Sequence, residues 1–453
     1  MQSIDPTHGT LLSTFSEHSE REVSHHIEAA SNAQSEWRET SIQHRASMTI
    51  RLADLLERDR EKLATLMAHE MGKPIVQGRA EIDKCAWACR YYAEETERIL
   101  EDLVLPTGRT KSYVTYQPLG VILAVMPWNF PFWQVIRFVA PALMAGNAAV
   151  LKHASNVMGS AAAIDDLIVE AGFPDGLFRS LLIPSGRVAA IIGNPLIAAV
   201  TLTGSDAAGR AVAATAGQEL KRTVLELGGS DPYLVLEDAD LDVAVQACAF
   251  GRLLNAGQSC IAAKRFIVHE SIVDEFTERL VTVMDAYVMG DPLDEGTELG
   301  PMARLDLRDE LHDQVKRSLA AGAELRLGGH IPEGPGAFYP PTVVSNVSAG
   351  MAVYEEETFG PVAAIISVKD EDEAVAVAND SPFGLGGAVF TRDLRRGENI
   401  ARNRIEAGSV FVNAFVASDP RLPFGGIKAS GYGRELSHVG MHEFLNIKTI
   451  VIQ

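Results

Sequence analysis

Between Gly120 and Leu227 apolar strands and helices alternate, and this alternation restricts the possible folds more than any other feature of the chain. Gly120–Met126 is a nearly continuous apolar run, and a helical pattern follows over Phe132–Ala145. Further strands are predicted at 148–151, 180–183, 198–203 and 223–227, and helices at 161–171, 187–192 and 207–218. Strands that are apolar on both faces are typical of a parallel sheet covered by helices. Such a sheet binds ligands beyond the carboxyl ends of its strands.

A second alternating block begins near Pro232–Leu236 and predicts a second α/β domain. It contains predicted helices at 243–254, 273–288 and 307–321, and strands at 265–269, near Val343, at 363–366 and at 387–390. Ahead of both blocks, residues 1–15 are predicted to form a short strand and turn, and Glu20–Tyr92 has a helical pattern. The chain of 453 residues is long enough for two or three domains, and we expect a boundary at Gly228-Gly229.

Charge and cysteine content exclude several classes of function. The net charge of −20 is spread along the chain, which argues against nucleic acid or an anionic membrane surface as partner. The N-terminus has no basic region followed by an apolar one, and no run approaches the ~18 apolar residues of a membrane span, so we expect a cytoplasmic protein. Cys85 and Cys89 lie four residues apart in a helical pattern and are expected in the core, so no metal site is predicted.

Two short motifs carry groups that could catalyse a covalent reaction. Glu226 ends an apolar run and is followed by two glycines, and Cys260 lies in the glycine-containing loop 257–260, behind a predicted helix. A thiol can attack an electrophilic carbon, and a carboxylate can take a proton from water. Together they suggest a thioester-type intermediate that is then hydrolysed. Taken alone, Cys260 is weak evidence for catalysis, because most free cysteines are buried small hydrophobic residues.

Two loops at predicted strand ends offer hydrogen-bond donors. Asn129 lies between two prolines in Pro127–Pro131, and its amide could donate to a developing oxyanion. The alternative is a turn asparagine that bonds to its own backbone. Gly204 and Ser205, with Gly209 shortly after, open a helix whose first N–H groups could hold a diphosphate. Ordinary capping of that helix by Ser205 is the alternative.

Three further side chains suit a dinucleotide. Lys152 ends a strand on the same side of the sheet and could reach a ribose or a phosphate. Glu357 and Phe359 lie in a loop stiffened by Pro361, where the carboxylate could bind a ribose diol and the ring could pack on a nicotinamide. Solvated surface side chains are the alternative for Lys152 and Glu357.

In this order, the motifs resemble the aldehyde dehydrogenase family over nearly the whole chain. The matching segments are Pro127–Pro131, Leu151-Lys152, Gly204-Ser205 with Gly209, Glu226–Gly229, Gly257–Cys260, Glu357–Pro361 and Pro423–Gly426. The resemblance implies an α/β fold with two parallel-sheet domains, a Rossmann-like cofactor domain and a catalytic domain, and a small β oligomerisation arm. The implied limits are 1–104 and 121–228 for the cofactor domain, 229–425 for the catalytic domain, 105–120 and 441–453 for the arm, and 426–440 for a return to the cofactor domain.

The resemblance also implies a role for each motif. Cys260 attacks the aldehyde carbon, and Asn129 and the Cys260 backbone N–H hold the oxyanion. Hydride passes to the nicotinamide, Glu226 activates water to release the acyl group, and Glu435 matches a position that supports this water. The implied cofactor contacts are Trp128, Lys152, Ser155, Gly204, Ser205, Gly209, Leu227, Glu357 and Phe359.

The implied cofactor is NADP or NAD. NAD-preferring members of the family often have Glu where this chain has Ser155. A carboxylate would repel the 2′-phosphate of NADP, whereas a hydroxyl near Lys152 would accept it, so NADP is expected to be usable and is the candidate for the preferred cofactor. The neighbouring His153 replaces the usual proline, and no role is assigned to it.

Within the family, the chain most resembles the short bacterial succinate-semialdehyde dehydrogenases. The features are Val150–Gly159, Leu227–Pro232 and Ala417–Asp419, and Arg137 and Ser418 match positions that bind the distal carboxylate of the substrate. Leu254 departs from the pattern, since several relatives have Arg there. A broader oxidase of semialdehydes or aliphatic aldehydes is therefore the alternative, with Arg252 or Arg421 as candidate substitutes for the missing arginine.

Two further expectations come from the resemblance. Some relatives have a second cysteine two residues after the nucleophile, and Ala262 at that position predicts no disulfide switch. The strand near Lys111–Gln117 is expected to pair with Ile447–Gln453 in an arm that makes a homodimer or a tetramer.

Overall fold

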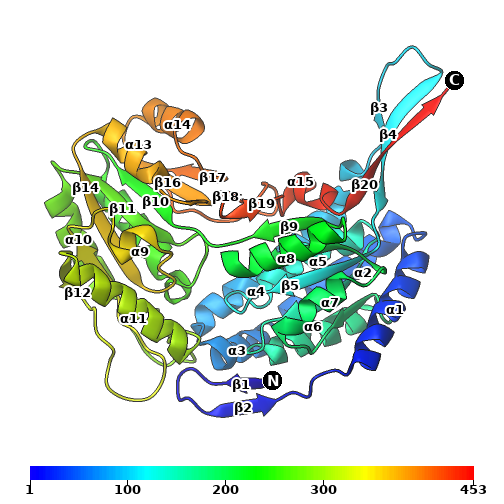
Figure 1. Ribbon diagram of the computed structural model, residues 1–453, viewed down its shortest axis with the longest axis horizontal. Helices are drawn as coiled ribbons and strands as arrows, with labels where there is room; N and C mark the ends of the chain where they lie inside the picture. The colour runs from blue at the N-terminus through cyan, green and yellow to red at the C-terminus, as the bar shows by residue number, and fades with distance from the viewer.

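The computed structural model describes residues 1–453 as two α/β lobes and an extended arm (Figure 1). The first lobe contains a six-stranded sheet with the order β19-β9-β8-β5-β6-β7. Its strands are β5 (Val121–Met126), β6 (Ala148–His153), β7 (Phe178–Ser180), β8 (Ile197–Thr203), β9 (Arg222–Glu226) and β19 (Gly431–Tyr432). All pairs are parallel except β19 with β9. The predicted parallel sheet is therefore confirmed.

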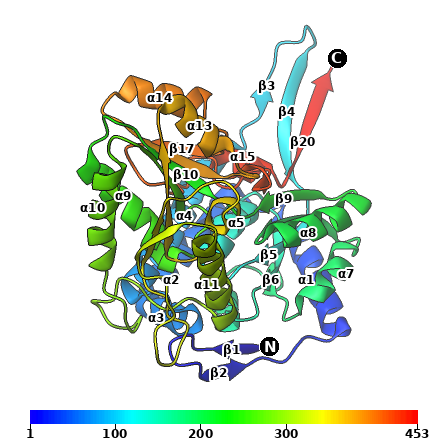
Figure 2. The same ribbon diagram turned by 60° about the vertical axis from the view of Figure 1, so that its left-hand side comes forward.

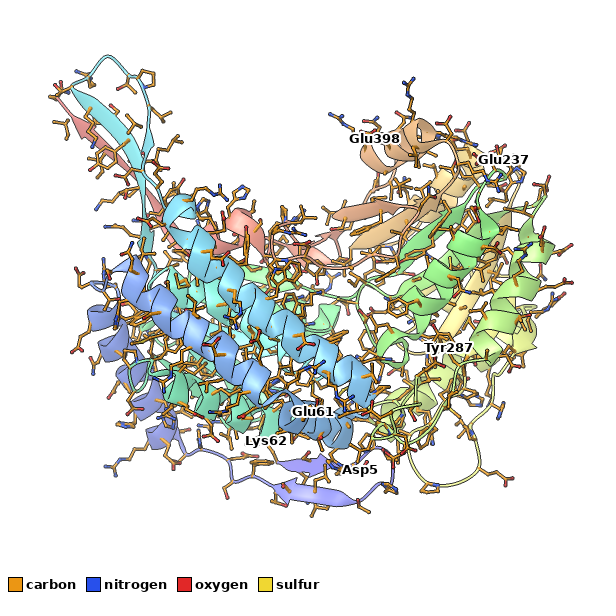
Figure 3. All side chains as sticks on the ribbon, turned by 180° about the vertical axis from the view of Figure 1, so that it is seen from behind. Asp5, Glu61, Lys62, Glu237, Tyr287 and Glu398 are labelled. Atoms are coloured by element: carbon orange, nitrogen blue, oxygen red, sulfur yellow. The ribbon has the colours of Figure 1, made fainter.

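Helices cover both faces of this sheet, as its apolar strands require. They are α1 (Glu20–Trp37), α2 (Ile42–Arg58), α3 (Arg60–Met71), α4 (Ile75–Ile99), α5 (Trp133–Met144), α6 (Met158–Ala171), the turn η1 (Ser185–Arg187), α7 (Val188–Ile192), α8 (Asp206–Gln218) and α15 (Ser437–His442). Every residue of α5 is buried, because the helix lies between the sheet and α2 and α4. From behind, α2 and α4 run side by side across this lobe (Figure 3).

The second lobe contains a seven-stranded sheet with the order β12-β13-β14-β11-β10-β16-β17, parallel except between β12 and β13. The strands are β10 (Asp231–Val235), β11 (Ala263–His269), β12 (Glu324–Leu327), β13 (Thr342–Ser345), β14 (Val362–Val368), β16 (Gly386–Phe390) and β17 (Ser409–Val412). The helices are α9 (Leu241–Leu253), the turn η2 (Leu254–Gly257), α10 (Val273–Asp285), α11 (Leu305–Ala320), α12 (Ala352–Glu355), α13 (Glu371–Asn379) and α14 (Leu394–Asn403). The short strands β15 (Phe383–Gly384) and β18 (Ile427–Lys428) pair with each other.

The arm extends away from the first lobe and consists of β3 (Leu103–Val104), β4 (Lys111–Pro118) and β20 (Leu445–Ile452), as both views show (Figure 1, Figure 2). β20 pairs antiparallel with the whole length of β4, so the predicted pairing of these two segments is present. β3 pairs with the other edge of β4. The paired arm thus begins two residues before the predicted limit at residue 105.

Several predicted elements differ from the structure. The predicted strand 180–183 is shifted, because β7 follows directly on the turn at Gly176 (φ +83°) and pairs with β6 only as far as Ser180. The predicted helix 273–288 ends at Asp285. Residues 1–15 form a hairpin of two strands, β1 (Gln2–Ile4) and β2 (Leu11–Thr14), in place of one strand and a turn. No helix combines the length and the apolar character that a membrane-spanning segment needs.

Candidate active site

Two cavities meet at Cys260. The larger, of about 540 Å³, lies beyond the carboxyl ends of β5, β8 and β9, where a doubly covered parallel sheet binds its ligands. The smaller, of about 340 Å³, is lined by α4, α5 and the segment 415–418. The two linings share one residue, which is Cys260. A ligand in either cavity can therefore contact this cysteine.

The loop before Cys260 is held by an unusual backbone. Asn255 and Ala256 both have positive φ, and Gly257 follows with a φ of +71°. Burial raises the pKa of the Cys260 thiol to about 12, although the positive charges of Arg137 and Lys264 oppose this rise. The thiol is therefore neutral at rest near pH 7.

Glu226 is buried next to these groups at the end of β9. Neither carboxylate oxygen has a hydrogen-bond partner, and the side chain lines neither cavity. Burial raises its pKa well above the ordinary value, and the nearby Glu435 charge raises it further, while Arg137 opposes both effects. A buried polar atom without a partner is costly, so these two oxygens can bind a water or accept a proton.

Asn129 lies in a loop that is fixed from several sides. Its backbone carbonyl accepts hydrogen bonds from Lys73 Nζ at 3.0 Å and from Asn255 Nδ2 at 2.7 Å. The Asn129 Nδ2 donates to the Gln258 carbonyl at 3.0 Å, which ties this loop to the one that contains Cys260. Asn129 is thus joined to the cysteine loop, and an N–H of its amide remains for an oxyanion.

His153 belongs to the same hydrogen-bond network, a role that the sequence analysis did not predict. Its ring is fully buried, and burial lowers its pKa to about 4, so the imidazole is neutral. Nδ1 accepts from the Ala154 N–H at 2.9 Å, and this tautomer leaves Nε2–H to donate to the Pro131 carbonyl at 2.9 Å. The histidine therefore fastens the end of β6 to the loop that contains Asn129.

The larger cavity collects most of the predicted cofactor contacts. Its lining includes Trp128, Gly204, Ser205, Leu227, Glu357 and Phe359. The rings of Trp128 and Phe359 meet edge to face with centroids 5.8 Å apart. Ser205 also caps α8, since its Oγ accepts from the Ala208 N–H at 3.3 Å. Capping and diphosphate binding by this helix end are compatible, because Gly204 and Ser205 line the cavity themselves.

The other predicted cofactor residues lie outside that lining. Gly209 is buried beneath Leu227. Lys152 is half-buried, and burial lowers its pKa, while Ser155 is exposed beyond the end of β6. Glu357 lines the cavity but already accepts from the Gly229 N–H at 3.0 Å and lies 3.6 Å from Lys264 Nζ. A cavity at the ends of the parallel strands, with a helix N-terminus, aromatic rings and a carboxylate in its wall, fits a dinucleotide.

Replacing Gly209 by alanine should damage this cavity. An added Cβ would lie 2.6 Å from both terminal carbons of Leu227, so this side chain must shift and the wall of the cavity that it lines must change. Because the substitution leaves Cys260 in place, we expect the KM for the cofactor to rise about tenfold with a smaller change in kcat. Steady-state kinetics with varied cofactor measures this. A Gly217→Ala variant is the control, because nothing lies within 4 Å of the added carbon there. Equal cofactor KM values in both variants would contradict the expectation.

The smaller cavity contains the predicted carboxylate-binding residues. Arg137 and Ser418 both line it, as does Leu254. Arg137 is already paired with Glu435, and its Nη2 donates to Thr203 Oγ1 at 3.0 Å. Glu435, expected to support the water used by Glu226, is therefore held by Arg137.

Neither candidate substitute for the missing arginine reaches this cavity. Arg252 is fully buried and donates to the Gly257 carbonyl at 2.6 Å, and Arg421 pairs with Asp419 at 2.6 Å on the surface. Lys84 lines the cavity instead and donates to Ser418 Oγ at 2.7 Å. The only sequence signal for it was its place on one face of α4, in helical register with Gln77 and Glu81.

Comparison with known proteins now settles the family. Residues 1–450 match the aldehyde dehydrogenase family. The chain belongs to this family. It is 50% identical over 453 residues to "Succinate-semialdehyde dehydrogenase [NADP(+)] 1" of Mycobacterium tuberculosis, covering 99% of each chain. It is 49% identical over 451 residues to a "Probable succinate-semialdehyde dehydrogenase [NADP(+)]" of Synechocystis, again covering 99% of each.

Solved structures agree with this family assignment. The succinic semialdehyde dehydrogenase of Streptococcus pyogenes, determined in complex with NADP⁺, superposes with a TM-score of 0.98 at 40% identity. The match covers 100% of this aldehyde dehydrogenase and 99% of the streptococcal chain. The predicted family and its α/β fold, with two lobes and a β arm, are confirmed.

Proposed function

We propose that this aldehyde dehydrogenase oxidises succinate semialdehyde to succinate, with NADP as the preferred cofactor and NAD as a usable one. The observation that supports this most is the position of Cys260 between the two cavities, one suited to a dinucleotide and one containing cationic side chains. The relatives at 49–50% identity have this activity in their names. Water supplies the second oxygen of the product.

In the first step, the Cys260 thiol passes its proton to solvent water and the sulfur bonds to the aldehyde carbon. Burial raises the pKa of the thiol and so opposes its ionisation. The positive charges of Arg137 and Lys264 favour the thiolate and partly offset this effect. The Asn129 amide and the Cys260 N–H then hold the oxygen of the thiohemiacetal. A nicotinamide cofactor held by residues of the larger cavity, among them Trp128, Ser205 and Phe359, would supply the acceptor for the hydride that leaves this carbon. The acyl group remains on the sulfur as a thioester.

In the second step, Glu226 takes a proton from a water molecule that attacks the thioester carbon. The carbon–sulfur bond breaks, the proton taken by Glu226 passes to the sulfur and restores the thiol, and the acid loses its remaining proton to solvent and leaves as succinate. The buried and unpaired oxygens of Glu226 support this assignment, since no protein donor competes for them. Glu435 keeps Arg137 in place beside this site and, with Thr203, fixes its guanidinium.

The proposed preference for NADP rests on Ser155. An exposed serine next to the half-buried Lys152 gives a 2′-phosphate a hydroxyl and a cation, with no carboxylate to repel it. Replacing Ser155 by Glu should lower kcat/KM for NADP about 30-fold and leave kcat/KM for NAD within about twofold. Steady-state kinetics with each cofactor tests this. An equal change for the two cofactors would show that residue 155 does not face the 2′-position.

We further propose that the arm joins copies of this chain into a homodimer or a tetramer. The arm exposes several large apolar side chains that a lobe of this protein does not cover: Leu103, Val104, Leu105, Ile447, Val451 and Ile452. Contiguous exposed apolar residues mark interaction surfaces. We also propose the domain limits implied by the family, with the arm beginning at Leu103.

The substrate is tested by a screen of aldehydes with and without a terminal carboxylate, at chain lengths from three to six carbons, with NADP and NAD in parallel. The proposal expects the largest kcat/KM for succinate semialdehyde. Equal values for butanal and succinate semialdehyde would favour the broader aliphatic aldehyde oxidase, for which Leu254 in the cavity wall is the supporting observation.

A further inference from the structure

Three cations line the smaller cavity, and two of them are neutralised by the protein itself. Lys73 is paired with Glu81, and both side chains are buried. Arg137 is paired with Glu435, which is equally buried. A cation with a carboxylate already in contact has less attraction for a second one. These two residues are therefore weak candidates for binding an anionic group of the substrate.

Lys84 is the third cation, and no carboxylate of the protein lies within 4.0 Å of its Nζ. The Nζ donates to Ser418 Oγ at 2.7 Å and lies 4.5 Å from the centroid of the Trp133 ring. An ammonium has three N–H donors, and a hydroxyl uses one of them. Lys84 thus faces the cavity with hydrogen-bonding capacity that the protein does not use.

The charged form of Lys84 is destabilised in the free enzyme. Burial and, to a smaller extent, the positive charge of Arg137 on α5 together lower the pKa of Lys84 to about 8. The Cys85 thiol and the Glu81 carboxylate on α4, and the Asp419 carboxylate beyond the segment 415–418, oppose this lowering, but neither carboxylate lies within 4.0 Å of the Lys84 Nζ. A buried charge is stabilised when a partner of opposite sign approaches, so a carboxylate in the cavity would offset the cost.

We propose that Lys84, together with Ser418, binds the terminal carboxylate of the aldehyde substrate and so selects ω-carboxylated aldehydes. This inference rests on the proposed function and deepens it, because it assigns the specificity of the same cavity to a helix that the substrate motifs do not include. It also explains Leu254: with an ammonium in the wall of the same cavity, no arginine is needed at that position.

The matched test compares succinate semialdehyde with butanal, which has the same number of carbons and no carboxylate. In Lys84→Met, we expect kcat/KM for succinate semialdehyde to fall about 30-fold, mostly through KM, and kcat/KM for butanal to change less than threefold. Lys62→Met is the control, since Lys62 lies on the outer surface at α3 (Figure 3) and should leave both substrates unaffected. An equal fall for the two substrates, or no fall for succinate semialdehyde, overturns the inference.

The pH dependence gives a second readout that a structural role of Lys84 would not produce. Above pH 8, an increasing fraction of Lys84 loses its proton, so the ratio of kcat/KM for succinate semialdehyde to that for butanal should fall as pH rises. The ratio cancels the titrations of Cys260 and Glu226, because both substrates need these groups. Lys84→Arg keeps its charge at high pH and should hold the ratio constant up to pH 10. A wild-type ratio that is also constant over this range overturns the inference.

Different results would overturn the proposed substrate and the proposed role of Lys84. A wild-type enzyme that does not favour succinate semialdehyde over butanal overturns the proposed substrate and, with it, the role of Lys84. A wild-type enzyme that favours succinate semialdehyde while Lys84→Met keeps the same preference overturns only the role of Lys84. If Lys84→Met does not fold, the pH dependence of the wild type and of Lys84→Arg decides alone.

Discussion

Cys260→Ala should lose aldehyde oxidation by about 10⁴-fold or more while its fold stays intact. The reason is the position of this side chain: it is the only residue that touches both cavities, so no neighbouring group can take its place between substrate and cofactor. The other thiols, Cys85, Cys89 and Cys248, are buried in the hydrophobic core. The measurement is cofactor reduction at saturating aldehyde, with circular dichroism to check the fold.

The matched control is Cys248→Ala, which removes a buried thiol from α9 in the core of the second lobe. It should keep kcat and lower the free energy of unfolding by about 1 kcal/mol. The pair therefore separates chemistry from packing: one variant loses activity at nearly constant stability, and the other loses stability at nearly constant activity. Cofactor reduction by Cys260→Ala at the wild-type rate would refute the covalent mechanism.

The sequence predicted strands accurately where both faces of the strand are buried. β5 and β8 were placed to within a residue because β5 is apolar throughout and the apolar run of β8 is interrupted only by threonine, and the expected core positions of Cys85 and Cys89 are confirmed. The helices α13 and α14 were missed because both are short: the apolar residues of α13 are alanine and valine within three turns, and α14 is mostly polar. The strand β17 was also missed, because it has only four residues and lies at the edge of its sheet.

The residues of the candidate site likewise fall into two groups, those that local sequence motifs predict and those that only the tertiary structure brings together. Asn129, Glu226 and Cys260 lie in motifs whose local sequence is informative, each at a strand or helix end. The partners of the predicted residues were not predictable, because they come from distant segments. Arg137 meets Glu435 from the C-terminal part of the chain, and Lys84 meets Ser418 across more than three hundred residues. Such pairings depend on how the helices pack on the sheets, which local sequence patterns do not encode.

Glu226→Gln should stop the reaction halfway. Glutamine has nearly the same shape but cannot take a proton from water, so the thioester should form and then persist, with turnover lowered about 10³-fold. Rapid mixing should show a burst of one reduced cofactor per active site, followed by a slow phase. Mass spectrometry of the stalled enzyme should then find the acyl group on Cys260. An adduct on another residue, or the absence of a burst, would remove Glu226 from the second step.

The stability of this variant provides an internal check on the state of Glu226. Burial raises its pKa in the folded protein above the unfolded value, so its contribution to stability is complete below the unfolded pKa and is lost as pH rises toward the folded pKa. A neutral glutamine has no such loss. Glu226→Gln should therefore be at least as stable as the wild type at pH 7 to 8, with the difference vanishing at low pH, as measured by thermal unfolding. A variant that is less stable than the wild type at pH 8 but not at pH 5 would mean that the fold stabilises the ionised carboxylate, which would contradict a raised pKa of Glu226 in the folded protein.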